Sequence, residues 1–142
     1  MKVVFGIPGQ PYGKGRPRIG RVAGNARMFT PAKTVSYENL VTVMALQAMA
    51  GRPLIEGPVS VILTINCQIP ASWPKKKQML ALAGEVWPTT KPDIDNVEKI
   101  IYDAINAVVW KDDVQVVDVT KVKRYAAVPG VRVCVETLDG AA

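Results

Sequence analysis

Histidine is absent from all 142 residues of the chain. This absence excludes triads built on histidine, zinc proteases that bind their metal through histidine, and nucleases that use a histidine general base. Catalysis by this chain would therefore have to use carboxylates, lysine or a metal ion.

Cysteine and long apolar runs are also scarce. Cys67 and Cys134 each stand alone in an apolar run, without the paired spacing of a zinc site or the density of a secreted disulfide scaffold. The apolar stretches 41–50 and 59–65 are too short and too interrupted to cross a bilayer. We therefore expect two reduced thiols, no signal peptide, no membrane span and a cytoplasmic location.

The charged residues are unevenly distributed along the chain. Eighteen Lys and Arg against twelve Asp and Glu give a net charge of +6, which is consistent with a polyanionic partner. Residues 1–37 contain seven basic residues and no acid. By contrast, seven of the twelve acids fall between Asp93 and Asp118, so the sequence has two regions of opposite charge.

The hydrophobic content of 49% can fill a core, and the length fits one domain, placed at residues 1–142. Alternating apolar residues predict four strands, over 3–7, 59–67, 114–125 and 131–135. The last two are expected to form a hairpin through Pro129 and Gly130. Helical spacing predicts two long helices and one short helix, over 31–51, 95–110 and 74–82. These elements predict an α/β (α+β) fold with a mixed sheet of about four strands.

Residues 9–30 are predicted to form a long, exposed, basic loop. The segment from Gly9 to Met28 contains five glycines, and Pro11 and Pro17 disfavour regular strand pairing. Its glycines and lysine lack the spacing of a phosphate-binding P-loop, so we expect no nucleotide cofactor. The candidate residues for contacts with nucleic-acid phosphates are Lys14, Arg16, Arg18, Arg21 and Arg27. The alternative for each of them is a solvated position on a basic loop.

The segment 91–96 is the strongest candidate for a catalytic site. Pro92 favours an extended chain, in which Asp93 and Asp95 would point the same way and Ile94 toward the core. Asp95 would then stand at the start of a helix with one polar face. The other residues of that face are Asn96, Lys99, Asp103 and Asn106.

Asp112 and Asp113 follow this helix and can fold back toward the first two aspartates. Several carboxylates in one place repel one another unless a cation neutralises them, and oxygen-rich clusters suit hard cations such as Mg²⁺. Simpler interpretations remain open: a capping box of Asp95 and Glu98, a surface ion pair of Asp95 and Lys99, and a solvated turn at the later aspartates.

These residues resemble the RusA family of Holliday junction resolvases. The hallmark of that family is an Asp-x-Asp-Asn run opening a helix, a lysine four residues after the second aspartate, and a later Asp-Asp pair before a strand. The matching residues here are Asp93, Asp95, Asn96, Lys99, Asp103, Asp112 and Asp113. The resemblance implies that Asp93, Asp95 and Asp113 bind Mg²⁺ or Mn²⁺ and are catalytic, that Lys99 supports catalysis, and that Asp112 is a further candidate ligand.

By this resemblance the chain would be a Mg²⁺-dependent, structure-specific endodeoxyribonuclease that resolves Holliday junctions by paired symmetric nicks in DNA recombination and repair. It would act on four-way branched DNA as a homodimer with a RusA-like fold, at the nucleoid of a bacterium or encoded by a phage. Two alternatives are a non-catalytic basic DNA-binding module and a nuclease of the same fold that cuts flaps or replication forks. A purely structural protein would leave the two charged regions without a purpose.

Overall fold

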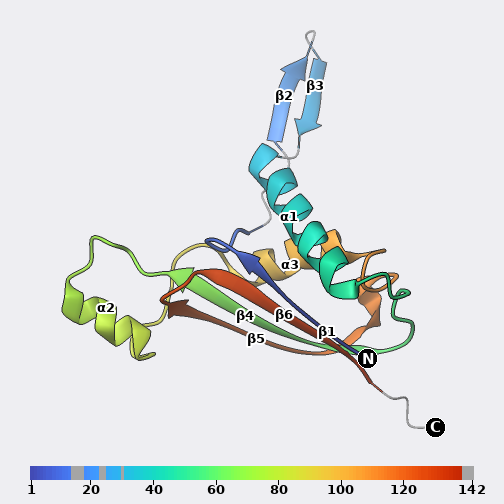
Figure 1. The fold of residues 1–142 in the computed structure, drawn as a ribbon. Coiled ribbons are helices and arrows are strands. Elements are labelled where there is room, and N and C mark those ends of the chain that lie inside the picture. The colour runs from blue at the N-terminus through green and yellow to red at the C-terminus, as the bar shows by residue number, and fades with distance from the viewer. Residues whose placement is uncertain (14–17, 23–24, 30, 139–142) are drawn as a thin grey trace.

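A computed structural model describes the backbone of residues 1–13, 18–22, 25–29 and 31–138, and the side chains of residues 1–13 and 31–138. Over these residues the chain forms a four-stranded sheet, three α-helices and a separate two-stranded ribbon (Figure 1). The mixed α and β architecture predicted from the sequence is confirmed.

The sheet has the strand order β1-β6-β4-β5. Its strands are β1 (Lys2–Pro8), β4 (Val59–Gln68), β5 (Val116–Ala126) and β6 (Gly130–Thr137). β4 and β5 run parallel, whereas β6 is antiparallel to both β1 and β4. The sheet is therefore mixed and has the expected number of strands.

The predicted hairpin between the last two strands is wrong, because β4 lies between β5 and β6. Leu63 of β4 pairs with Lys121 on one side and with Val133 on the other. β4 buries every second residue, whereas β5 has no fully buried residue. The more apolar strand therefore takes the interior position and β5 takes the edge. The parallel pairing requires a crossover, which residues 69–115 supply.

The helices are α1 (Ala32–Met49), α2 (Lys75–Leu82) and α3 (Ile94–Ile105). α1 and α3 cover one face of the sheet, and no described helix covers the other face (Figure 1). Val41 of α1 and Ile100 of α3 are fully buried in the core between helices and sheet. α2 lies beside one end of the sheet and buries only Ala81. None of the described helices combines the length and apolar character needed to cross a membrane.

Helix α3 is shorter than predicted, because it ends at Ile105 rather than near Trp110. Ala107 takes a left-handed conformation with φ 63°, and its amide donates to the Trp110 carbonyl at 2.7 Å. The Trp110 indole donates to the Asn106 side chain at 2.6 Å and is completely buried. This turn brings the indole into the core, and it removes Asn106 from the polar helix face on which the sequence placed it.

The predicted basic loop also contains regular structure, contrary to expectation. β2 (Arg18–Val22) and β3 (Asn25–Phe29) form a two-stranded antiparallel ribbon. Pro11 and Pro17 both precede the ribbon, so they do not interrupt its pairing. The ribbon extends beyond the N-terminal end of α1 and away from the sheet (Figure 1).

Candidate functional site

An open hollow of about 350 Å³ lies between α3 and the start of β5. Its lining residues are Asp95, Glu98, Lys99, Tyr102, Asp113 and Val116. A larger hollow of about 620 Å³ lies elsewhere, along β1 and β6, but it contains no carboxylate among its lining residues. The smaller hollow is therefore the candidate site, because its lining contains carboxylates.

Asp95 and Asp113 reach this hollow from two different elements. Asp95 lies in the first turn of α3, and its side chain is 91% exposed. Asp113 is half-buried and begins a short 3₁₀ turn, Asp113–Gln115, just before β5. The structure thus brings together two of the carboxylates that the sequence singled out, although they belong to different elements.

Asp93 and Asp112 are not among the residues that line the hollow. α3 begins at Ile94, so Asp93 is the exposed residue that precedes the helix and Asp95 is already helical. The expectation that the two aspartates belong to one extended run is therefore wrong. Ile94 packs against the core as expected. Direct participation by Asp93 or Asp112 stays a prediction.

Glu98 is the best-connected carboxylate of the hollow. The Lys121 ammonium donates to its Oε1 at 2.8 Å, and the Tyr102 hydroxyl donates to its Oε2 at 2.9 Å. Its side chain is only 17% exposed. Because both oxygens are engaged and α3 begins before Asp95, the capping box of Asp95 and Glu98 is not formed.

Tyr102 and Lys121 are held in the protonation states that suit this network. Burial raises the pKa of Tyr102 well above its ordinary value, helped by the hydrogen bond to Glu98 and by the charges of Glu98 and Asp113. The hydrogen bond to Glu98 is the main cause of the raised pKa of Lys121. A neutral phenol and a charged ammonium therefore both donate to Glu98.

Lys99 lines the hollow but does not pair with Asp95. Its ammonium lies 4.0 Å from the carboxylate of Asp103, four residues later on α3, and its side chain is 66% exposed. Among the described side chains, the cation that pairs with Asp95 is instead Lys121, at 3.6 Å from Oδ1. Lys99 is therefore an exposed charge at the rim, whereas Lys121 lies between two carboxylates.

The turn that carries Asp113 is fastened by Gln115. Its side-chain oxygen accepts hydrogen bonds from the amides of Lys111 and Asp112, at 2.9 and 3.1 Å. Its side-chain nitrogen donates to the carbonyls of Ile55 and Gly57, both at 2.9 Å. The turn is thus bound to the segment that precedes β4, and it is not merely the solvated turn that one interpretation of the sequence allowed.

Two further contacts fix the chain that leads into α3. The Lys123 ammonium donates to the carbonyls of Thr90 and Pro92, at 2.8 and 3.0 Å. A Cβ atom at Gly13 would lie 2.9 Å from Cβ of Asn96, which is closer than such atoms approach. The start of the basic segment therefore passes directly against the head of α3, and only glycine fits there.

The structure describes the predicted phosphate-binding residues only in part. Arg18 and Arg21 belong to β2 and Arg27 to β3, where the backbone alone is described. Lys14 and Arg16 lie outside the described residues. Their contacts with DNA stay a prediction.

Sequence reasoning missed Lys121, Tyr102 and the role of Glu98. A signal existed on α3, since Asp95, Glu98 and Tyr102 follow helical spacing and share one face. The contribution of Lys121 could not be read in the same way, because it depends on the parallel pairing of β4 and β5.

The donor atoms of the hollow are compatible with a hard cation. Within the described residues, no three carboxylate or thiol side chains already stand in range of one ion. Asp95 and Asp113 offer carboxylate oxygens to the same hollow, whereas both oxygens of Glu98 are occupied. Mg²⁺ commonly keeps several waters and binds through one or two carboxylates and a substrate phosphate, so this donor set fits it.

Comparison with known proteins shows the family of this chain. The family model described as endodeoxyribonuclease RusA matches residues 8–136. The chain is also 39% identical over 141 residues to YqaN of Bacillus subtilis (strain 168), a protein described as uncharacterized, and the match covers 96% of this chain and 97% of that protein. The family match contains the hollow, the ribbon, β4, β5 and β6 up to Glu136, whereas only Pro8 of β1 lies within it. The chain belongs to the RusA endodeoxyribonuclease family.

Proposed function

We propose that this protein is a Mg²⁺-dependent endonuclease, also active with Mn²⁺, that resolves Holliday junctions by paired symmetric nicks. The observation that carries this proposal is the meeting of Asp95 and Asp113 at one hollow, beside two lysines. A bound Mg²⁺ would polarise the scissile phosphate and lower the pKa of a bound water. Membership of the RusA family supports the same reaction class.

In this proposal the residues around the hollow have different roles. Asp95 and Asp113 would hold the ion, and Asp93, the residue before α3, would be a further ligand. Lys99, which is exposed at the rim, contacts the phosphate that gains negative charge during cleavage. Tyr102 and Glu98 do not react, because their polar atoms are already bound to each other and to Lys121.

The direct test is cleavage of a four-way junction by the Asp95→Asn and Asp113→Asn variants in Mg²⁺. Each should lower the cleavage rate by at least 100-fold, because a neutral amide binds a hard cation poorly. Glu85→Gln, at an exposed acid after α2, is the matched control and should cleave like the wild type. Cleavage by Asp95→Asn at the wild-type rate would refute the assignment, and cleavage of flaps or forks in preference to junctions would favour the rival substrate.

The DNA path in this proposal follows the ribbon toward the hollow. Gly13, at the base of the ribbon segment, lies against Asn96 and Pro92, so a duplex along the ribbon leads to the head of α3. Arg18, Arg21 and Arg27 would contact phosphates of that duplex. We propose the ribbon as the main electrostatic contact with the junction.

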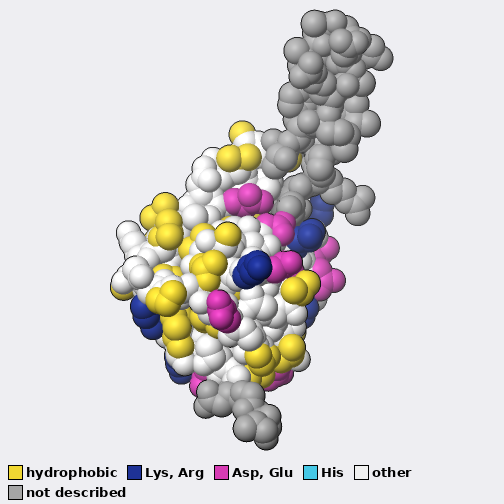
Figure 2. All heavy atoms as spheres, turned by 90° about the vertical axis from the view of Figure 1, so that its right-hand side faces the viewer, with side chains coloured by type: hydrophobic (Ala, Val, Ile, Leu, Met, Phe, Trp, Pro, Cys, Tyr) yellow, Lys and Arg dark blue, Asp and Glu magenta, His cyan; other side chains and the backbone are white. Residues whose placement is uncertain are grey.

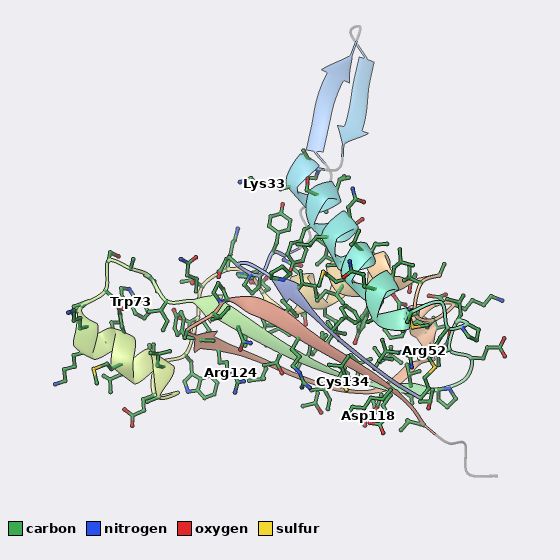
Figure 3. The ribbon with its side chains drawn as sticks, viewed as in Figure 1. Lys33, Arg52, Trp73, Asp118, Arg124 and Cys134 are labelled. Carbon is green, nitrogen blue, oxygen red and sulfur yellow. The ribbon has the colours of Figure 1, made fainter. Side chains whose placement is uncertain are left out.

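We also propose that the protein is a homodimer that uses the face of the sheet without helices. Ile62 is 47% exposed on that face, and its neighbour in register, Cys134, is flanked by Val4 on the other side. Asp118 and Arg124 lie toward opposite ends of β5 (Figure 3). A two-fold axis through the apolar middle would place the acidic end of one sheet over the basic end of its partner.

A further inference from the structure

We infer that Lys121 is a positioning residue of the proposed metal site: a counterion, anchored by Glu98, that holds Asp95 in place and competes with the divalent cation for it. This inference rests on the proposed function, since it concerns the same carboxylates. It assigns a role to three side chains, Glu98, Tyr102 and Lys121, that the proposed cleavage reaction does not use.

The first step is that Glu98 acts as an anchor and does not serve as a ligand. One of its oxygens accepts from Lys121 at 2.8 Å and the other accepts from Tyr102 at 2.9 Å. The Tyr102 ring packs edge-on against the buried Trp110, with ring centroids 5.3 Å apart, so the phenol has a fixed position. Glu98 could bind a metal ion only by giving up one of two good hydrogen bonds.

The second step is that Lys121 cannot easily leave. Its backbone lies in the middle of β5, paired with Leu63 of the central strand β4. Its side chain reaches across to α3 and is 31% exposed, with its ammonium between Glu98 and Asp95. Partly buried and doubly paired, this cation is held more firmly than the exposed Lys99.

The third step concerns charge. Without a divalent ion, the ammonium of Lys121 offsets the repulsion between Asp95 and Glu98 and keeps Asp95 aimed at the hollow. A divalent ion held by Asp95 would be repelled by the same ammonium, which lies 3.6 Å from Oδ1 of Asp95. A unit charge at that range changes the affinity for a divalent ion by about tenfold even when water screens it.

The test is titration of the whole protein with Mn²⁺ alone, without DNA, by calorimetry or by the electron paramagnetic resonance of free Mn²⁺. Lys121→Met should bind Mn²⁺ about tenfold more tightly than the wild type. Lys121→Arg keeps the charge and should bind like the wild type. Lys75→Met removes the same charge from the exposed start of α2, away from the hollow, and should also leave the affinity unchanged.

A second measurement covers the case in which Lys121→Met folds poorly. Glu98→Gln removes the anchor and one negative charge but leaves Lys121 free to pair with Asp95, so Mn²⁺ should bind more weakly than in the wild type. Unchanged or weaker binding by a folded Lys121→Met, or tighter binding by Glu98→Gln, would overturn the inference alone. Equal binding of Mn²⁺ by the wild type and Asp95→Asn would overturn both the inference and the proposed metal site.

Discussion

Tyr37 places a hydroxyl in the core that makes no hydrogen bond of good geometry among the described residues, although the nearby backbone of Tyr12 opposes part of the rise in its pKa. An unsatisfied buried hydroxyl costs about 1–3 kcal/mol, which the ring offsets by packing against Tyr12, with centroids 5.8 Å apart. Tyr37→Phe removes the hydroxyl and keeps the ring. We expect the variant to gain about 1 kcal/mol in free energy of unfolding at pH 7, measured by urea denaturation.

The same hydroxyl predicts a pH dependence with a definite sign. Burial raises the pKa of Tyr37 to about 12, against an ordinary value of 10.0. Between these values the unfolded chain releases a proton that the folded chain retains, so stability present below pH 10 is lost as the pH rises through this window. Tyr37→Phe should therefore lose less stability between pH 9.5 and pH 11 than the wild type. An equal loss in both proteins would show that Tyr37 does not titrate as inferred.

The 3₁₀ turn before β5 depends on one side chain for its position. Gln115 makes four hydrogen bonds, two within the turn and two to the segment before β4. Gln115→Ala should lower the free energy of unfolding by about 2 kcal/mol, because backbone groups lose their partners. It should also slow junction cleavage, because Asp113 is carried by the same turn.

The control for this variant is Gln47→Ala, at an exposed position of α1. It should change neither stability nor cleavage measurably, since exposed helical positions tolerate alanine. If Gln115→Ala lost stability but cleaved junctions at the wild-type rate, the turn would support the fold without positioning Asp113.

Local patterns predicted those elements whose burial follows a simple period. α1 and β4 agree with the sequence because each buries one regular face. The end of α3 could not be predicted, because burial of Trp110 outweighs the apolar spacing that continues past Ile105. The false hairpin has a similar cause: which strand becomes the neighbour of β6 is decided by competition over the whole sheet.

The candidate site likewise contains residues that the sequence could predict and residues that it could not. Asp95 and Asp113 could be paired in advance, because one helix and a turn connect them along the chain. Lys121 could not, because it reaches Glu98 from 23 residues away through a strand pairing that the sequence does not specify. Residue types and spacing thus indicate the candidate ligands, whereas the fold is needed to find the residues that position them.

The sheet face without helices predicts the state of assembly. Ile62→Asp puts a charge in the apolar middle of that face, next to Cys134. Burying an unpaired carboxylate is costly, so the proposed dimer should dissociate in this variant at concentrations where the wild type is expected to remain paired. Light scattering after size-exclusion chromatography measures this directly. Val43→Asp, at an exposed position of α1, should remain dimeric, and a monomeric wild type would exclude this interface.

The distribution of charge over the molecule predicts how DNA binding responds to salt. On the face shown in Figure 2, Asp and Glu side chains are mixed with Lys, Arg and apolar groups, so that face has no broad positive field. The acid-free N-terminal region, which contains β2 and β3, is the part of the sequence with excess positive charge. Each lysine or arginine that neutralises a DNA phosphate contributes about 0.9 to the slope of log affinity against log salt concentration.

Removing two arginines from the ribbon therefore has a quantitative consequence. The double variant Arg18→Ala, Arg21→Ala should reduce the magnitude of this slope by about 2 for a four-way junction in EDTA, where no cleavage occurs. The variant Lys75→Ala, Lys76→Ala removes equal charge from α2 and should leave the slope nearly unchanged. If the α2 variant lowered the slope and the ribbon variant did not, DNA would approach the hollow from the α2 end of the sheet, and the proposed path along the ribbon would be wrong.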